Sequence, residues 1–178
     1  MELFLERGVK NTSMDDISSY LRISKKTLYQ YVDNKEDLLT KIMDKIKNSH
    51  STAGPAVWLK KYNAIDVFFI ASNKIYNFQM SVKKPFRFDM EKYYPHLWFD
   101  FMNSMREKTY KFLKEIIKDG IKDGFFREDL DIDMTATMYN AKIEGVHQDF
   151  ARNPEKYTYR QLFEALFEQQ IRAIATEK

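Results

Sequence analysis

The chain of 178 residues is 44% hydrophobic and 31% charged, a balance typical of a globular protein and not of a disordered one. It contains no cysteine, which excludes a disulfide framework and a thiolate metal site. The net charge of +3 is too small to diagnose nucleic-acid binding by itself. No uncharged apolar run approaches the ~20 residues of a membrane span, and the first residues lack the features of a signal peptide, so we expect a cytoplasmic protein.

Short helices with polar caps are predicted before residue 50. Small polar or acidic residues stand where a helix begins, and glycine or an Asp-Asn pair stands where one ends. The predicted boundaries are Gly8 for the end of the first helix, Thr12 or Ser13 to Tyr20 for the second, Ser24 to about Val32 for the third, and Asn34 for the start of the fourth.

The third predicted helix combines side chains that bind phosphates or base edges with apolar side chains that can be buried. The polar and aromatic set is Lys25, Lys26, Thr27, Tyr29, Gln30 and Tyr31, and the apolar set around it is Ile17, Leu21, Ile23 and Leu28. Positive charge is in excess between Arg22 and Lys35. The natural partner of such a short helix is the major groove of DNA. The alternatives are a solvated helix face for the lysines and a core position for each tyrosine.

Longer helices are predicted after a small polar linker, His50–Gly54, and no segment alternates as a β-strand would. Breaks are expected at Lys84-Pro85, at Pro95 and before Asn153-Pro154. The predicted elements are a helix from Pro55 to about Met80, a short segment Phe86–Tyr94, a helix His96–Lys122, a loop Phe125–Asp131, a helix from Asp131 or Asp133, and a last helix of about Thr158–Thr176. About nine helices are therefore expected in an all-α fold.

Motifs that would indicate an enzyme are missing from the sequence. Glu144 and His147 form a single Glu-x-x-His, whereas di-iron bundles use two such motifs and two further carboxylates. His50 and His96 have no matching partner, and no phosphate loop, nucleophile elbow or paired-histidine zinc motif is present. We expect no enzyme activity, no cofactor and no metal.

The segment GVKNTSMDDISSYLRISKKTLYQYVDNKEDLL, Gly8–Leu39, resembles the DNA-binding segment of the TetR family of bacterial transcriptional regulators. The segment GFFREDLDID weakly resembles the loop before the dimerisation helices of that family. The resemblance implies an N-terminal helix-turn-helix domain with a connecting fourth helix, residues 1–49, and a helical ligand-binding and dimerisation domain, residues 50–178. Compared with the family, the first helix is expected to be truncated. Arg22 replaces the usual glycine of the turn, where a left-handed backbone would cost about 1 kcal/mol or more.

A TetR-like protein is implied to be a repressor that binds a palindromic operator as a homodimer. The DNA contacts implied are Thr12, Ser13, Ser24, Lys25, Lys26, Thr27, Tyr29, Gln30, Tyr31 and Lys35. The last two helices are implied to form the dimer interface, with burial inside the monomer as the alternative. The interface candidates are Leu162, Phe163, Leu166, Phe167, Gln170, Ile171 and Ile174.

The middle helices are implied to enclose a pocket for a small hydrophobic or aromatic ligand. The candidates are Trp58, Tyr62, Phe69, Tyr76, Phe88, Tyr94, Trp98, Met102, Met105 and Met138. The alternative for each is a packed aromatic core, because methionine and aromatic residues commonly fill cores. The competing functions are a regulator without a small-molecule ligand and, from a different class, a metal-binding helical-bundle enzyme.

Overall fold

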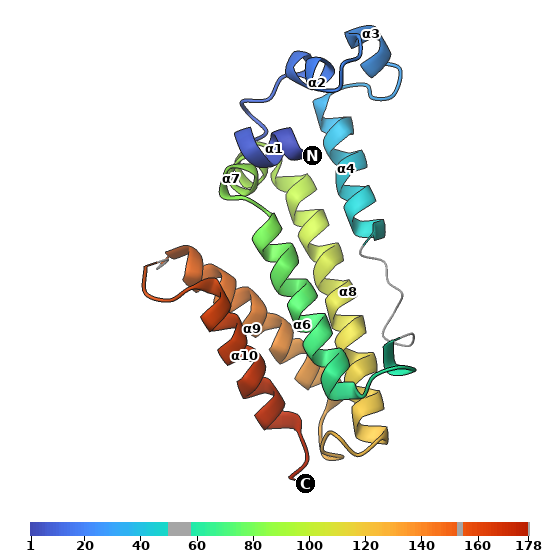
Figure 1. Cartoon of the computed structure of the whole chain (residues 1–178), viewed down its shortest axis with the longest axis vertical. Helices are drawn as coiled ribbons and strands as arrows, with labels where there is room; N and C mark the ends of the chain where they lie inside the picture. Colours follow the sequence, from blue (N-terminus) through green and yellow to red (C-terminus); the bar gives the residue numbers. More distant parts are fainter. Residues whose placement is uncertain (50–57, 153–154, 178) are drawn as a thin grey trace. The chain divides into compact units, whose positions relative to one another are not determined.

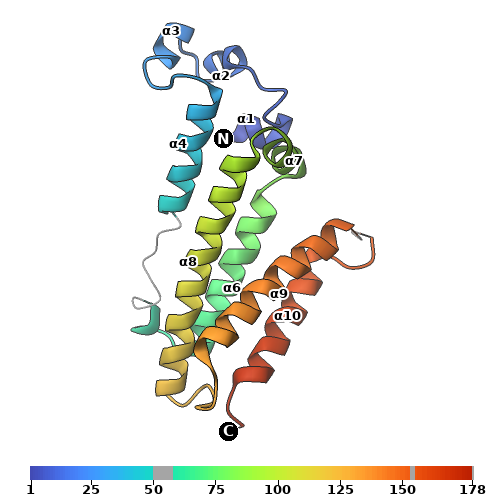
Figure 2. The same cartoon turned by 180° about the vertical axis from the view of Figure 1, so that it is seen from behind.

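The computed structural model describes residues 1–49, 58–152 and 155–177, and in this part of the chain all the named elements are helices (Figures 1 and 2). Its helices are α1 Glu2–Arg7, α2 Met14–Tyr20, α3 Lys25–Leu28, α4 Lys35–Ser49, α6 Ala64–Ser81, α7 Lys84–Tyr93, α8 Pro95–Lys122, α9 Ile132–Arg152 and α10 Tyr159–Ile174. The all-α prediction is confirmed. Within the described ranges, no helix is both long and apolar enough to cross a bilayer.

The described residues divide into two compact units. The first contains residues 1–49 and 80–105, and the second contains residues 58–79, 106–152 and 155–177. The sequence prediction placed a single boundary at residue 50, so the assignment of residues 80–105 to the first unit differs from it. The physical reason is the packing of α1 against α7, visible in both views of the ribbon.

The first unit is built around α1, α2, α3, α4, α7 and the first part of α8. Its buried side chains include Leu3, Phe4, Val9, Ile17, Leu28, Val32, Leu39, Met43, Phe86, Met90, Trp98 and Phe101. Asp89 of α7 is buried and its Oδ2 accepts the Lys10 N–H at 2.7 Å. Gly8 adopts φ 84° above this carboxylate, and a Cβ added there would lie 2.5 Å from Asp89 Oδ2. Glycine at position 8 therefore lets α1 and its following turn approach α7 closely.

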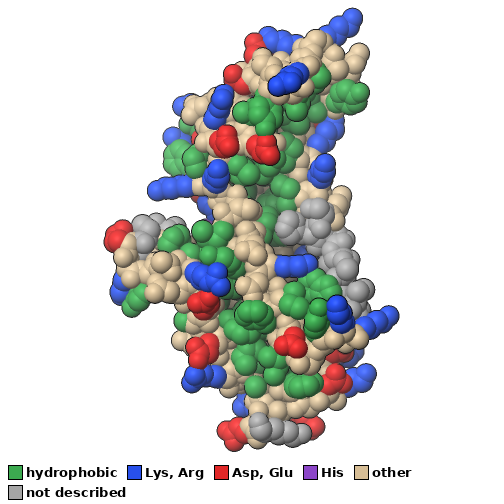
Figure 3. Space-filling model, in the orientation of Figure 1, with side chains coloured by type: hydrophobic (Ala, Val, Ile, Leu, Met, Phe, Trp, Pro, Cys, Tyr) green, Lys and Arg blue, Asp and Glu red, His purple; other side chains and the backbone are tan. Residues whose placement is uncertain are grey.

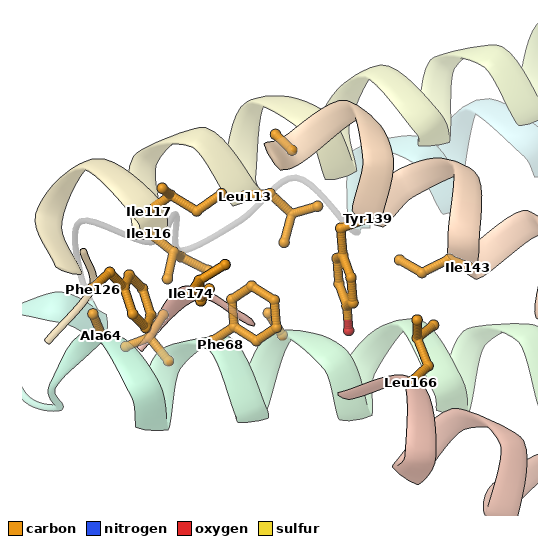
Figure 4. Packing of buried hydrophobic residues seen from close by; sticks show 13 residues of the cluster. Ala64, Phe68, Leu113, Ile116, Ile117, Phe126, Tyr139, Ile143, Leu166 and Ile174 are labelled. Atoms are coloured by element: carbon orange, nitrogen blue, oxygen red, sulfur yellow. The ribbon is translucent and has the colours of Figure 1, made fainter. Parts of the chain in front are cut away.

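The second unit is held together by an apolar core between α6, α8, α9 and α10 (Figure 4). Phe68 of α6 is central, with ring centroids 5.0 Å from Tyr139 and 6.5 Å from Phe126. The Tyr139 hydroxyl points toward α6, where it lies 3.0 Å from the Ser72 hydroxyl. The remaining buried members of the core are Ala64, Val67, Ala71, Leu113, Ile116, Ile117, Ala136, Ile143, Leu166 and Ile174.

Side-chain caps explain where the helices of the second unit begin. Asn63 Oδ1 accepts the Asp66 N–H at 2.9 Å before α6, and Asp131 Oδ1 accepts the Met134 N–H at 2.9 Å before α9. Thr158 forms a capping box before α10. The prediction of one continuous helix from Pro55 to about Met80 is wrong, because residues 60–63 are not helical and α6 begins only after the Asn63 cap. Pro55 and the His50–Gly54 linker lie outside the described residues.

Candidate functional site

The start of α2 is fixed by a reciprocal pair of hydrogen bonds. The Asp16 N–H donates to Ser13 Oγ at 3.1 Å, and the Ser13 N–H donates to Asp16 Oδ2 at 2.7 Å. The Ser13 hydroxyl also donates to Asp16 Oδ2, at 2.5 Å, and this bond and the one from the Ser13 N–H lower the pKa of the Asp16 carboxyl. Because this capping box satisfies two backbone donors, it holds the entry into the helix-turn-helix in one geometry.

A Schellman motif ends α2 and forms the turn that leads to α3. The Arg22 N–H donates to the Ser19 carbonyl at 3.1 Å, and the Ile23 N–H donates to the Ser18 carbonyl at 3.0 Å. Arg22 has φ 55°, the left-handed backbone that such a turn requires at its first residue after the cap. The turn therefore carries the cost of about 1 kcal/mol or more that was expected for a left-handed backbone at Arg22.

Helix α3 is shorter than predicted. Ser24 Oγ caps it by accepting the Thr27 N–H at 3.0 Å, and the helix ends at Leu28 instead of continuing to about Val32. Tyr29 is the C-cap, and the chain continues in tighter turns, with the Tyr31 N–H donating to the Leu28 carbonyl at 3.0 Å. Leu28 and Val32 are buried in the structure, and their spacing of four residues also fits an α-helix. The periodicity of the sequence therefore cannot distinguish these tighter turns from a continued α-helix.

Basic and aromatic side chains of α3 and the turn after it are exposed, as predicted for a DNA-binding surface. Tyr29 is 48% exposed and Tyr31 70% exposed, so neither is the core aromatic that the alternative required. Lys25, Lys26 and Gln30 are also exposed. Figure 3 shows Lys and Arg side chains on the part of the first unit that α2 and α3 form.

Two lysines of this region are less free than the others: Lys25 is paired with an acidic residue, and Lys35 is partly buried. Lys25 Nζ lies 2.5 Å from Asp15 Oδ1, and this hydrogen bond raises the pKa of the lysine. Lys35 is half-buried at the start of α4, and the loss of solvation lowers its pKa although Asp89 and Asp16 oppose that shift. The side chain of Lys35 therefore packs partly against the protein at the start of α4 and does not extend fully into solvent.

Thr12 is the predicted contact that the structure contradicts. Its side chain is fully buried, and its hydroxyl donates to the Gly8 carbonyl at 2.7 Å. A fully buried hydroxyl cannot reach a phosphate, so Thr12 supports the turn after α1. Ser13 and Ser24 remain exposed, but their hydroxyls are occupied as caps.

Residues 1–42, which contain this capped helix pair, match the family model for bacterial regulatory proteins of the tetR family. The similarity of sequence is therefore to the DNA-binding segment of that family and covers the first 42 residues of the chain. No curated protein shows significant similarity to the sequence. The matched residues contain α1, α2 and α3 and the first half of α4.

Solved structures support the same fold over nearly the whole chain. A TetR-family transcriptional regulator from Cytophaga hutchinsonii shares 20% identity, with a TM-score of 0.71 over 99% of this chain and 90% of that one. The FadR regulator of Bacillus subtilis, solved with stearoyl-CoA, shares 19% identity, with a TM-score of 0.67 over 96% and 92%. The SmeT–triclosan complex shares 15% identity, with a TM-score of 0.70 over 99% and 88%.

The predicted pocket residues are divided equally between the two units. Phe88, Tyr94, Trp98, Met102 and Met105 belong to the first unit, and Trp58, Tyr62, Phe69, Tyr76 and Met138 belong to the second.

Several of these residues also have surroundings that do not suit a pocket wall. Phe69 and Phe88 are more than half exposed, and Met138 and Tyr62 are also exposed. Trp98 is buried and stacks on Phe101 with centroids 5.8 Å apart, so it is a core residue. Trp58 packs edge-on against Phe112 at 5.5 Å.

Four of the seven predicted dimer contacts on α10 are buried inside the second unit. Phe163, Leu166, Gln170 and Ile174 are at most 6% exposed, because α10 packs this stripe against its own unit. Those four predictions are therefore wrong as contacts with a second copy. Leu162, Phe167 and Ile171 are only partly buried.

Sequence reasoning missed two buried polar features because their partners are distant in the sequence. Asp89 accepts the backbone N–H of Lys10, 79 residues away. Ser72 and Tyr139 pair across 67 residues. Neither pair leaves a local pattern that a sequence alone displays.

Proposed function

We propose that the chain is a transcriptional regulator of the TetR type and that it binds operator DNA through α3 and the turn after it. The observation that carries the proposal is the exposure of Lys26, Tyr29, Gln30 and Tyr31 directly after the Ser24 cap. Lys26 contacts a phosphate or a guanine edge, and Gln30 is suited to adenine. The hydroxyls of Tyr29 and Tyr31 contact DNA phosphates or base edges. Ser13, Ser24, Lys25, Thr27 and Lys35 complete the proposed surface, and Thr12 is omitted.

Binding to a selected duplex tests this surface. The probe is a DNA duplex that the wild-type protein selects from a randomised library, followed by fluorescence anisotropy at several salt concentrations. We expect Lys26→Ala to weaken binding and to reduce the salt slope by about 1, the value for one phosphate contact. Tyr29→Ala should weaken binding by roughly tenfold, since a lost direct contact is worth about 1–3 kcal/mol.

A lysine in the second unit provides the matched control. Lys118 is exposed on α8, so Lys118→Ala removes the same charge from a helix that is not proposed to bind DNA. Its affinity and salt slope should equal those of the wild type. Wild-type affinity in both Lys26→Ala and Tyr29→Ala would overturn the assignment of the surface.

The protein is further proposed to act as a homodimeric repressor in the cytoplasm. A two-fold operator requires two α3 helices about 34 Å apart, one DNA turn, which one copy cannot supply. The exposed face of α9 supports a self-association surface, because Met134 and Met138 are 58% and 52% exposed there. Met138→Glu should shift the mass in light scattering toward the monomer and weaken binding to the selected duplex. An unchanged mass would exclude Met138 from the interface.

A small hydrophobic or aromatic ligand is proposed to release the DNA. FadR and SmeT, which share the fold, were solved with stearoyl-CoA and with triclosan. A ligand that prefers a conformation unable to hold both half-sites would shift the population away from the DNA-bound state. Stearoyl-CoA and triclosan are therefore the first probes. A ligand should raise the melting temperature by mass action and displace the duplex, and the absence of both effects would reject that compound.

A further inference from the structure

The turn between α2 and α3 is the only place in the described residues where a non-glycine backbone has a positive φ. Its two hydrogen bonds, from Arg22 and Ile23, are those of a Schellman motif, and Arg22 occupies the left-handed position. Glycine adopts this conformation without steric cost, whereas the Cβ of any other L-residue is crowded. The arginine at position 22 is therefore strained relative to a glycine.

The end of α8 shows the same motif with the residue that the geometry favours. The Gly124 N–H donates to the Ile121 carbonyl at 3.0 Å, and the Phe125 N–H donates to the Gly120 carbonyl at 2.8 Å. Gly124 has φ 74°, against 55° for Arg22. One chain thus contains two copies of the motif that differ in the residue at the left-handed position. The α8 copy lies in the unit that is not proposed to bind DNA.

The side chain of Arg22 has the properties of a residue that binds phosphate. It is exposed, and the described residues give it no ion pair, unlike Lys25, which is bonded to Asp15. Only one residue separates it from Ser24, the cap of α3. A guanidinium matches the oxygens of a phosphate with two parallel hydrogen bonds. Strain at a functional surface is retained where the strained residue contributes to binding.

We propose that Arg22 is a phosphate-binding residue of the DNA interface, present at the left-handed position of the turn in place of a less strained glycine. The proposal rests on the proposed function of α3, because it places the phosphate on the DNA strand that flanks that helix. Arg22 holds the backbone of the duplex, and α3 contacts the bases. Replacing the arginine by glycine then affects stability and DNA affinity in opposite directions.

Arg22→Gly tests the proposal with two independent measurements. The melting temperature should rise by about 2 °C, since the substitution relieves a left-handed side chain. Affinity for the selected duplex should fall roughly five- to tenfold at moderate salt, and the salt slope should decrease by about 1. Arg22→Lys keeps the charge and should retain the salt slope. Its weaker affinity would measure the contribution of the guanidinium geometry.

Gly124→Arg is the matched control, because it puts an arginine into the second copy of the motif. It should lower the melting temperature and leave the affinity and salt slope at wild-type values. Wild-type affinity and slope in Arg22→Gly would overturn the proposal even if Lys26→Ala and Tyr29→Ala lose affinity. If those two variants also bind normally, the proposed DNA surface itself fails. A lower melting temperature in Arg22→Gly would overturn the assignment of strain.

Discussion

The segment from Ser13 to Leu39 and the bundle of the second unit are stabilised in different ways. The segment contains helices of seven and four residues, each begun by a serine cap. The bundle contains longer helices that share an apolar core around Phe68 and Tyr139. Short helices are marginal without caps and tertiary contacts, whereas long helices are stabilised mainly by burial of an apolar face.

This difference explains why the sequence predicts the short helices of the segment better than the packing of the bundle. A cap is a hydrogen bond between residues two or three positions apart, so Ser13 and Ser24 can be recognised from the residues that follow them. A core contact in the bundle joins residues far apart, and an apolar stripe does not specify its partner. The variants below test whether the two regions respond to these different forces, beginning with the largest expected effect.

Phe68→Ala should be the most damaging substitution in the bundle. The Phe68 side chain is fully buried among Tyr139, Phe126 and Phe167, so truncation leaves a cavity. We expect a loss of about 3–5 kcal/mol in the free energy of unfolding, measured by urea denaturation. The control is Phe69→Ala at the next position, where the side chain is 54% exposed and the loss should be below about 1 kcal/mol. Equal losses would contradict the assigned core.

Alkaline pH should weaken the bundle through Tyr139. Burial raises the pKa of the Tyr139 hydroxyl from 10.0 to about 12. The neutral form is favoured in the folded state, so its contribution is fully present below pH 10 and is lost as the pH rises from 10 to 12. The loss is about 2–3 kcal/mol, since one pKa unit corresponds to about 1.4 kcal/mol. The difference in unfolding free energy between wild type and Tyr139→Phe should change across that range, and a constant difference would refute the shift.

Gly8→Ala should destabilise the first unit, where backbone conformation matters more than side-chain volume. The backbone at Gly8, φ 84° and ψ 165°, is accessible essentially to glycine alone. The new Cβ would also lie 2.5 Å from Asp89 Oδ2. We expect a loss of about 2 kcal/mol in thermal or urea unfolding. Gly145→Ala is the control, because a Cβ there meets no atom within 4 Å and should stabilise α9 by up to about 1 kcal/mol.

The Ser72–Tyr139 pair is a polar contact inside an apolar core, and its removal should have the smallest effect. Tyr139→Phe leaves the buried Ser72 hydroxyl without its partner, at a cost of about 1–2 kcal/mol. Adding Ser72→Ala removes both hydroxyls and should recover most of that loss. Calorimetric unfolding of the two single variants and the double variant measures the coupling. Additive losses would show that the two hydroxyls do not interact.

Much of the fold was predictable because helix ends have local signals. The sequence indicates Thr12 or Ser13, Ser24, and Asp131 or Asp133 as caps, and in the structure Ser13, Ser24 and Asp131 cap helices. The start of α6 was missed because the capping signal is Asn63, within a stretch of helical periodicity.

The exposure of Tyr29 and Tyr31 on the candidate DNA surface was also predictable, whereas the packing inside the bundle was not. Tyr29 and Tyr31 follow the Ser24 cap at fixed offsets, which the family resemblance supplies. The stripe of α10 was assigned to a second copy because an amphipathic pattern does not say which surface covers it. In the structure, Phe163 and Ile174 pack within their own unit.

The chain has two tryptophans, and each compact unit contains one of them. Trp98 is buried against Phe101 in the first unit, and Trp58 lies against Phe112 in the second. Trp58→Phe and Trp98→Phe would each leave a single indole emitter, so intrinsic fluorescence can follow one unit at a time without an added dye. Coincident melting curves from the two variants would identify a single cooperative unfolding transition. Separated curves would show that each unit unfolds in a transition of its own.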